Sequence, residues 1–141
     1  MKIPRLLLTF VAIIIFSSCA DKIVESVPSI DEKISNNVVR AKFSDIQNKV
    51  FDKSCALSGC HVTGVQKPGL SGNSYNNIVN VKSSTGMNYI EPGSPEKSYL
   101  YLKITGAPGI SGNTMPLGAS PLNSRVIDSI SVWIKNGAQN N

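Results

Sequence analysis

The chain has 141 residues, of which 41% are hydrophobic and 16% are charged, and this balance excludes a disordered polyelectrolyte and a protein with several membrane spans. The formal net charge is +5, but the basic residues are scattered and are not interleaved with aromatic ones, which argues against nucleic-acid binding. The length suits one domain, and eleven glycines and eight prolines predict that much of it is loop.

The N-terminus has the pattern of a secretory signal. Lys2 and Arg5 precede an apolar run over residues 6–16, and small residues follow at positions 17–19. A basic start, a short apolar stretch and small residues in this order predict a signal peptide over residues 1–18. Because the apolar stretch is too short to span a bilayer comfortably, we expect it to be removed rather than retained as a helical anchor.

Residues 16–19 read Phe-Ser-Ser-Cys and resemble a bacterial lipobox, although that pattern prefers leucine at its first position. The resemblance implies cleavage before Cys19 and acylation of this residue, which would anchor the protein to a membrane. The alternative is an ordinary signal peptide followed by an incidental cysteine. Lipidation of Cys19 leaves Cys55 and Cys60 as a pair outside the cytoplasm, where disulfides persist.

Residues 19–40 are polar and have no strong hydrophobic period, so we interpret them as a flexible tether. The folded domain is then expected over residues 41–141. Ser44 is a suitable helix cap, and apolar residues four positions apart follow it. This pattern predicts a helix over residues 45–53 with one apolar face.

The predicted helix leads directly into Cys55-Ala-Leu-Ser-Gly-Cys60-His61, which holds two of the three cysteines and the only histidine. A Cys…Cys-His run is what covalent haem attachment requires, since both thiols add to porphyrin vinyl groups and the adjacent imidazole reaches the iron from the same side. The usual run has two residues between the cysteines, whereas this one has four. The extra residues must bulge outward, and Gly59 has the backbone freedom to allow it.

The segments after the motif alternate between loops and short helices. Residues 62–72 are rich in small residues and proline and predict a loop, a short helix is expected over 73–79, and 80–93 have no regular pattern. Ser94, followed by proline and glutamate, predicts the start of a helix that ends at Gly106.

A second long loop and a final helix complete the chain. Residues 106–121 contain four glycines and three prolines, with Met115 and Pro116 in the middle of this loop. Asn123 or Ser124 is expected to begin the last helix, which Gly137 ends. The buried stripe of this helix is predicted to consist of Val126, Ile127, Ile130, Trp133 and Ile134.

Several short helices with few apolar residues predict an all-α domain with a modest core, so a large apolar group is expected to fill its middle. From about residue 43 to residue 138, the order of motifs resembles a mono-haem cytochrome c domain, and more narrowly the bacterial lipoprotein and planctomycete-type cytochromes with a Cys-x4-Cys-His motif. The resemblance implies an all-α, cytochrome c-like fold of short helices and long loops around a covalent haem. The matching segments are Cys55–His61, Pro92–Pro95, Tyr101–Ile104, Met115–Gly118 and Trp133–Ala138.

The resemblance also implies a role for each site residue. Cys55 and Cys60 would hold one haem c through thioether bonds. His61 would be the proximal iron ligand, with its other ring nitrogen held by a nearby carbonyl. Met115 would be the distal ligand, and a His/Met pair gives a relatively high reduction potential. The first and last helices would pack together, with Phe51 at or near their contact with the tryptophan of the last helix.

The function implied is that of a c-type cytochrome lipoprotein that carries single electrons and performs no substrate chemistry of its own, so we expect an electron carrier rather than an enzyme. Its partners would be redox proteins and, through the lipid on Cys19, a membrane, but not nucleic acid. It would lie at the bacterial cell envelope and face the periplasm or the exterior. One alternative is a haem-containing accessory subunit of a larger redox enzyme.

Other roles for the cysteines and other ligands stay open at this point. Cys55 and Cys60 would close a small loop as a disulfide in a non-haem envelope lipoprotein that acts as a binding module. A zinc site has weaker support, because these cysteines and His61 supply three ligands and no fourth is evident nearby. Met87, which also lies in a loop, competes with Met115 as the distal ligand. The side chains that would bind a haem propionate or simply pack or face solvent are Tyr75, Tyr89, Tyr99, Tyr101, Lys67 and Arg125.

Overall fold

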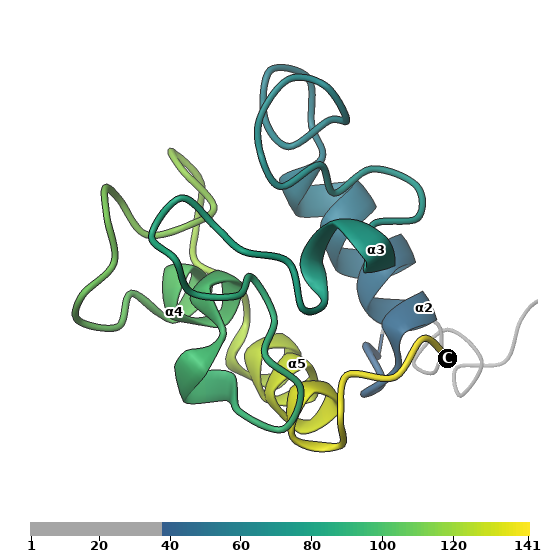
Figure 1. Ribbon diagram of the computed structural model, residues 1–141. Helices are drawn as coiled ribbons and strands as arrows, with labels where there is room; N and C mark the ends of the chain where they lie inside the picture. Colours follow the sequence, from purple (N-terminus) through teal and green to yellow (C-terminus); the bar gives the residue numbers. More distant parts are fainter. Residues whose placement is uncertain (1–37) are drawn as a thin grey trace, which may run out of the picture.

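The computed structural model describes residues 38–141, so the predicted signal peptide, Cys19 and most of the predicted tether lie outside the described residues. Helices cover 38% of the described part, and bridge residues of strand type cover 4%. The regular structure is therefore mainly helical, with long loops between the helices (Figure 1). In chain order the helical segments are α2 (Phe43–Ile46), η1 (Gln47–Cys55), α3 (Tyr75–Ile78), η2 (Pro95–Lys97), α4 (Tyr99–Thr105) and α5 (Ser124–Lys135).

The first helix consists of α2 and η1, which follow each other without a break. η1 has the wider turn of a π-helix, and the N–H of Ala56 donates to the carbonyl of Phe51 five positions earlier, at 2.7 Å. Such wide turns usually occur as single turns and are frequent at functional sites. Here the wide segment covers nine residues and ends at Cys55, the first residue of the cysteine motif.

A helix was correctly predicted here, but the expected cap by Ser44 is wrong. The helix begins at Phe43, and no side chain caps it from position 42. Instead, the N–H groups of Phe43 and Ser44 donate to Oδ1 and to the backbone oxygen of Asn141, each at 2.9 Å. The end of the chain thus supplies the acceptors that the first turn needs, as its position beside α2 in Figure 1 illustrates.

The middle of the chain is mostly loop, as predicted, with α3 inside the expected range 73–79. The region 80–93 contains isolated β-bridges, in which Val79 pairs with Ile90 and Lys82 pairs with Asn88. These bridges fold the segment back on itself and bring its end to the start of η2.

The single helix expected between Ser94 and Gly106 is wrong in two respects. The Ser94 side chain makes no capping bond, and the segment divides into η2 and α4 at Ser98. The fully buried hydroxyl of Ser98 accepts from the N–H of Glu91 and donates to the carbonyl of Ser94, both at 2.9 Å. These bonds compete with a continuous helix. Gly106 ends α4 in the left-handed conformation, as predicted (φ +66°).

The last helix, α5, is confirmed at both ends. Oδ1 of Asn123 accepts from the N–H of Arg125 at 2.9 Å and caps the first turn. Ile130, Trp133 and Ile134 are buried, and the remaining residues of the predicted stripe are partly buried against the core. α5 therefore turns its apolar face inward, toward the first helix and α4.

The first and last helices contact each other through aromatic rings. The ring centroids of Phe43 and Trp133 lie 5.7 Å apart, and the hydroxyl of Ser129 donates to the carbonyl of Val39 at 2.7 Å. The ring that packs on Trp133 is therefore Phe43, whereas Phe51 is buried along the wall of a cavity. The start of the first helix thus packs on α5, whereas its end, which includes Phe51 and Cys55, borders the cavity.

Candidate functional site

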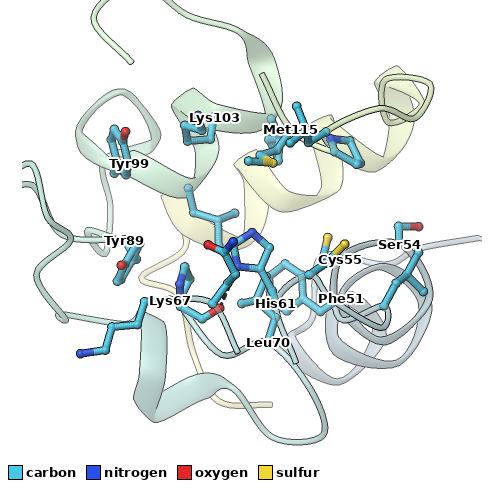
Figure 2. A pocket seen from close by; sticks show the side chains of 18 of the residues that line it. Phe51, Ser54, Cys55, His61, Lys67, Leu70, Tyr89, Tyr99, Lys103 and Met115 are labelled. Atoms are coloured by element: carbon cyan, nitrogen blue, oxygen red, sulfur yellow. Dashed lines mark hydrogen bonds between the residues drawn. The ribbon is translucent and has the colours of Figure 1, made fainter. Parts of the chain in front are cut away.

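A cavity of about 230 Å³ lies between the end of the first helix, the loop that follows it, α4 and the loop after α4. All four residues predicted to bind haem or its iron line this cavity: Cys55, Cys60, His61 and Met115. In the view of Figure 2, Met115 lies on one side of the cavity, and Cys55 and His61 lie on the other. The fold thus brings the cysteine motif and a distant methionine to one space.

The four residues between the cysteines form a tight turn. The N–H of Cys60 donates to the carbonyl of Leu57 at 2.9 Å, and the N–H of His61 donates to the carbonyl of Cys55 at 3.1 Å. Gly59 adopts a positive φ of +79° at the tip of this turn, where most other residues would be strained. With four residues between the cysteines, the turn therefore places His61 next to Cys55, at the end of the first helix.

Both thiols are free in the structure, and neither is part of a disulfide. Cys55 is half-buried and Cys60 is exposed. Burial raises the pKa of the Cys55 thiol to about 11, and the nearby Cys60 adds to this effect by charge repulsion. Cys55 is therefore a protonated thiol at neutral pH, close to a second thiol and facing the cavity.

His61 has a defined ring orientation. Its Nδ1 lies 3.0 Å from the backbone carbonyl of Pro68. Because a carbonyl oxygen only accepts hydrogen bonds, Nδ1 carries the hydrogen, and the neutral ring keeps a lone pair on Nε2. The N–H of Leu70 also donates to the carbonyl of His61 at 2.7 Å, so the same loop holds both the ring and the backbone of this residue.

Met115 comes from the loop that follows α4. Its N–H donates to the carbonyl of Lys103 at 2.9 Å, and Nζ of Lys103 donates to the carbonyls of Ser111, at 2.9 Å, and Asn113. The hydroxyl of Tyr99 accepts from the N–H of Ser111 at 3.2 Å. α4 therefore fixes the methionine loop through one backbone and several side-chain contacts.

The structure shows which of the residues with open roles line the cavity and which do not. Met87 is partly buried against the core and does not line the cavity, whereas Met115 does. Tyr75 donates to the carbonyl of Ala138 at 2.9 Å, away from the cavity. Of the other candidates for propionate binding, Tyr89, Tyr99 and Lys67 line the cavity, and Tyr101 and Arg125 do not.

The charge around the cavity is positive. Lys67 and Lys103 line it, and no aspartate or glutamate of the described segment does. Burial raises the pKa of the Tyr89 hydroxyl, and the neighbouring Tyr99 adds to the shift. The positive charge favours an anionic ligand group, and Lys67 is the lysine that would contact it, because Nζ of Lys103 is hydrogen-bonded to the methionine loop. The cavity floor is apolar, with Phe51, Leu70, Leu100 and Ile104 among its lining residues.

The carbonyl expected on the other ring nitrogen of His61 is present, and the structure identifies it as that of Pro68, which no side-chain pattern could have indicated. Sequence reasoning missed two further groups that hold the site together. Lys103 was noticed only as part of a motif, although a lysine at the start of a glycine-rich loop can pair with free carbonyls there. Gln47 gave a clearer signal, since it is a polar residue within the apolar face of the first helix and is only 4% exposed.

No family model, no curated protein and no solved structure matches this chain. Between residues 38 and 141, no group of three or more histidine, cysteine, aspartate or glutamate side chains is arranged to hold a metal ion. No helix within these residues has the length and apolar character needed to cross a bilayer. The convergence of two thiols, one imidazole and one thioether on the cavity is therefore the feature that bears on function.

Proposed function

We propose that the protein is a c-type cytochrome that carries single electrons through one covalently bound haem with His61 and Met115 as iron ligands. Cys55 and Cys60 would bind the haem as thioethers. Lipid on Cys19 would anchor the protein at the bacterial cell envelope, facing the periplasm or the exterior. The bound haem would supply a reversible one-electron couple.

One observation carries this proposal: Cys55, Cys60, His61 and Met115 line the same cavity. The donor set fits the cofactor, because two free thiols suit thioether attachment, and imidazole and thioether are a common ligand pair for haem iron in cytochromes c. The Nδ1–H of His61, paired with a carbonyl, leaves Nε2 suited to binding iron.

The shape and charge of the cavity also fit. Its volume of about 230 Å³ is below the roughly 300–1,000 Å³ of typical ligand sites, so a porphyrin would fill it and extend past its open side. Leu57, Cys60 and Leu117 line the cavity and are exposed, so they would border the uncovered edge. The apolar floor suits the macrocycle, and Lys67 at the rim suits its propionates.

The residues of the chain would have distinct roles in this carrier. His61 and Met115 would both hold the iron, which would supply the one-electron couple, and the chain would perform no substrate chemistry of its own. Phe51 and Leu70 would exclude water from one face, since both are buried along the cavity wall. The support of His61 by Pro68 and Leu70 would limit rearrangement on that side when the charge changes, which favours rapid electron transfer.

The proposal is tested by a haem stain after denaturing electrophoresis, on protein made together with cytochrome maturation machinery. We expect a stained band for the natural chain and none for the double variant Cys55→Ser/Cys60→Ser. The matched control is Cys19→Ser, which removes the third cysteine and should keep the stain. A natural chain without stain under these conditions would contradict the proposal.

A further inference from the structure

Gln47 is a buried amide with all of its hydrogen-bonding positions in use. It lies where α2 passes into η1 and is 4% exposed. Its Nε2 donates to the carbonyl of Leu70 at 2.7 Å and to Oδ1 of Asp52 at 2.9 Å. Its Oε1 accepts from the N–H and the hydroxyl of Ser74, at 3.0 and 2.7 Å. One side chain therefore fixes two positions of the 68–74 loop to the first helix.

The same loop holds His61. The carbonyl of Pro68 accepts from Nδ1 of the ring, and the N–H of Leu70 donates to the histidine carbonyl. Leu70 is thus bonded to Gln47 through its carbonyl and to His61 through its N–H. Asp52 supports this arrangement, because its Oδ1 also accepts from the N–H of Gly72 at 2.9 Å.

We propose that Gln47 is a positioning residue for His61, which acts through Leu70 and Pro68. By fixing the 68–74 loop, Gln47 keeps the Pro68 carbonyl on Nδ1 and the Nε2 lone pair available to the cavity. The consequence for an iron ligand rests on the proposed function, whereas the effect on the ring itself does not. A role limited to packing would require no amide, since an apolar side chain of similar length fills the same volume.

The inference predicts a change at the ring when the amide is removed. In Gln47→Met the loop loses its attachment, and the Pro68 carbonyl no longer stays on Nδ1–H. Because a firm hydrogen bond at Nδ1 makes the imidazole a stronger donor to iron, its loss should raise the reduction potential. The hydrogen on Nδ1 should also exchange faster with solvent, by about tenfold if the loop opens more readily by the strength of one or two hydrogen bonds.

The experiment is nitrogen-15 NMR of the histidine ring in the reduced, full-length protein, together with the midpoint potential. His61 is the only histidine, so the ring gives a single set of signals. The matched control is Asn77→Ala, which removes a 3.0 Å bond to the carbonyl of Gly69 in the same loop but at an exposed position. We expect exchange and potential to change in Gln47→Met and to stay at their natural values in Asn77→Ala.

Unchanged exchange in a folded Gln47→Met would overturn the inference, even if the variant were less stable. If Gln47→Met does not fold, Asp52→Ala replaces it, because this variant removes one support of Gln47 and one of Gly72. A smaller increase in exchange then supports the inference, and no increase overturns it. If the natural protein carries no haem, the proposed function fails, while the exchange rates still decide whether Gln47 positions His61.

Discussion

The two sides of the cavity are built in different ways. On the side of His61, the supporting residues Pro68, Leu70 and Gln47 are buried, and they are bonded to one another or to the histidine. The bond from Gln47 to Leu70 is buried, and the bond from His61 to Pro68 is partly buried. On the side of Met115, the supporting contacts lie near the surface. The hydrogen bonds that Lys103 makes to the methionine loop are exposed, as is most of that loop.

The difference indicates which side is the more easily opened. A buried hydrogen bond is costly to break because its partners have no water to replace them, whereas an exposed one exchanges with water at little cost. We therefore expect the His61 side to stay fixed and the Met115 side to open first. In the proposed electron carrier, this would place the covalent attachment and the more mobile ligand on opposite walls.

The largest expected change, in reduction potential and spectrum, is at Met115, the proposed iron ligand on the side that we expect to open first. In Met115→Leu, the thioether is replaced by a side chain of similar size that cannot bind iron. The reduction potential should fall, and the thioether-to-iron charge-transfer band should disappear, because thioether stabilises the reduced iron. Visible and near-infrared spectra with a redox titration provide the measurement, and Met87→Leu is the control. A band that survives Met115→Leu and is lost in Met87→Leu would reverse the ligand assignment.

Alanine variants of Gly59 and Gly106 compare the turn between the cysteines with the methionine loop. Gly106 and Gly59 both have positive φ, but a Cβ at Gly106 would lie 2.9 Å from Oγ1 of Thr114, whereas one at Gly59 would meet nothing within 4 Å. Gly59→Ala should cost about 1 kcal/mol of unfolding free energy from backbone strain alone. Gly106→Ala should cost about 2–3 kcal/mol, because the contact with Thr114 adds to the strain.

The measurement is chemical denaturation of both variants and the natural protein. Equal losses for Gly59→Ala and Gly106→Ala would show that Thr114 moves aside freely and that the base of the methionine loop is not closely packed.

The variant Lys103→Met tests how strongly the side chain of Lys103 holds the Met115 side of the cavity. The variant keeps the backbone bond to Met115 but removes the bonds from Nζ to Ser111 and Asn113. Loss of about 1 kcal/mol should open the loop roughly fivefold more often. External imidazole should therefore bind more tightly by the same factor, while exchange at Nδ1 of His61 stays unchanged. A visible titration with imidazole checks the first outcome; faster exchange at His61 would mean that the two sides are coupled.

The smallest change in stability is expected for Asp45, which lies at the start of the first helix and away from the cavity. Hydrogen bonds from the Arg40 side chain, with support from Lys49, hold the pKa of Asp45 well below its ordinary value of 3.8. A carboxyl with a lowered folded-state pKa stabilises the fold above its unfolded value, and this contribution is lost as the pH falls toward the folded-state value. Asp45→Asn should thus be slightly less stable than the natural protein at pH 7 and equal to it in strong acid.

Denaturation curves across this pH range test the prediction for Asp45, with Asp128→Asn, an exposed residue of α5, as the control. A loss of stability in Asp45→Asn that persists in strong acid would show that the residue acts through packing rather than through its charge.

The sequence predicted the elements whose signals are local. Asn123 caps α5 through a neighbour two positions away, and Gly106 ends α4 by its own conformation. The caps at Ser44 and Ser94 were predicted wrongly for two different reasons, one involving a distant residue and one a residue four positions away. Asn141 supplies the acceptors for the first helix, and the buried hydroxyl of Ser98 interrupts the helix expected after Ser94.

The same distinction between local and non-local signals applies to the candidate site. Cys55, Cys60 and His61 are recognisable as a motif because they are adjacent, and Met115 because it lies in a loop beside proline. The groups that hold these residues come from other parts of the chain, and the carbonyl of Pro68 leaves no mark in the side-chain pattern. Only a folded chain shows that Gln47, eight positions before Cys55 in the same helical segment, reaches the loop behind the histidine.

The most direct test of the central claim is the mass of the intact, denatured protein made with cytochrome maturation machinery. A covalent haem on Cys55 and Cys60 predicts a mass equal to that of the processed and acylated chain plus one haem, and the mass of this acylated chain alone, the bare chain, for the variant without these cysteines. If the natural protein instead has the mass of the bare chain, lowered only by the two hydrogens lost in a disulfide, the haem proposal is contradicted.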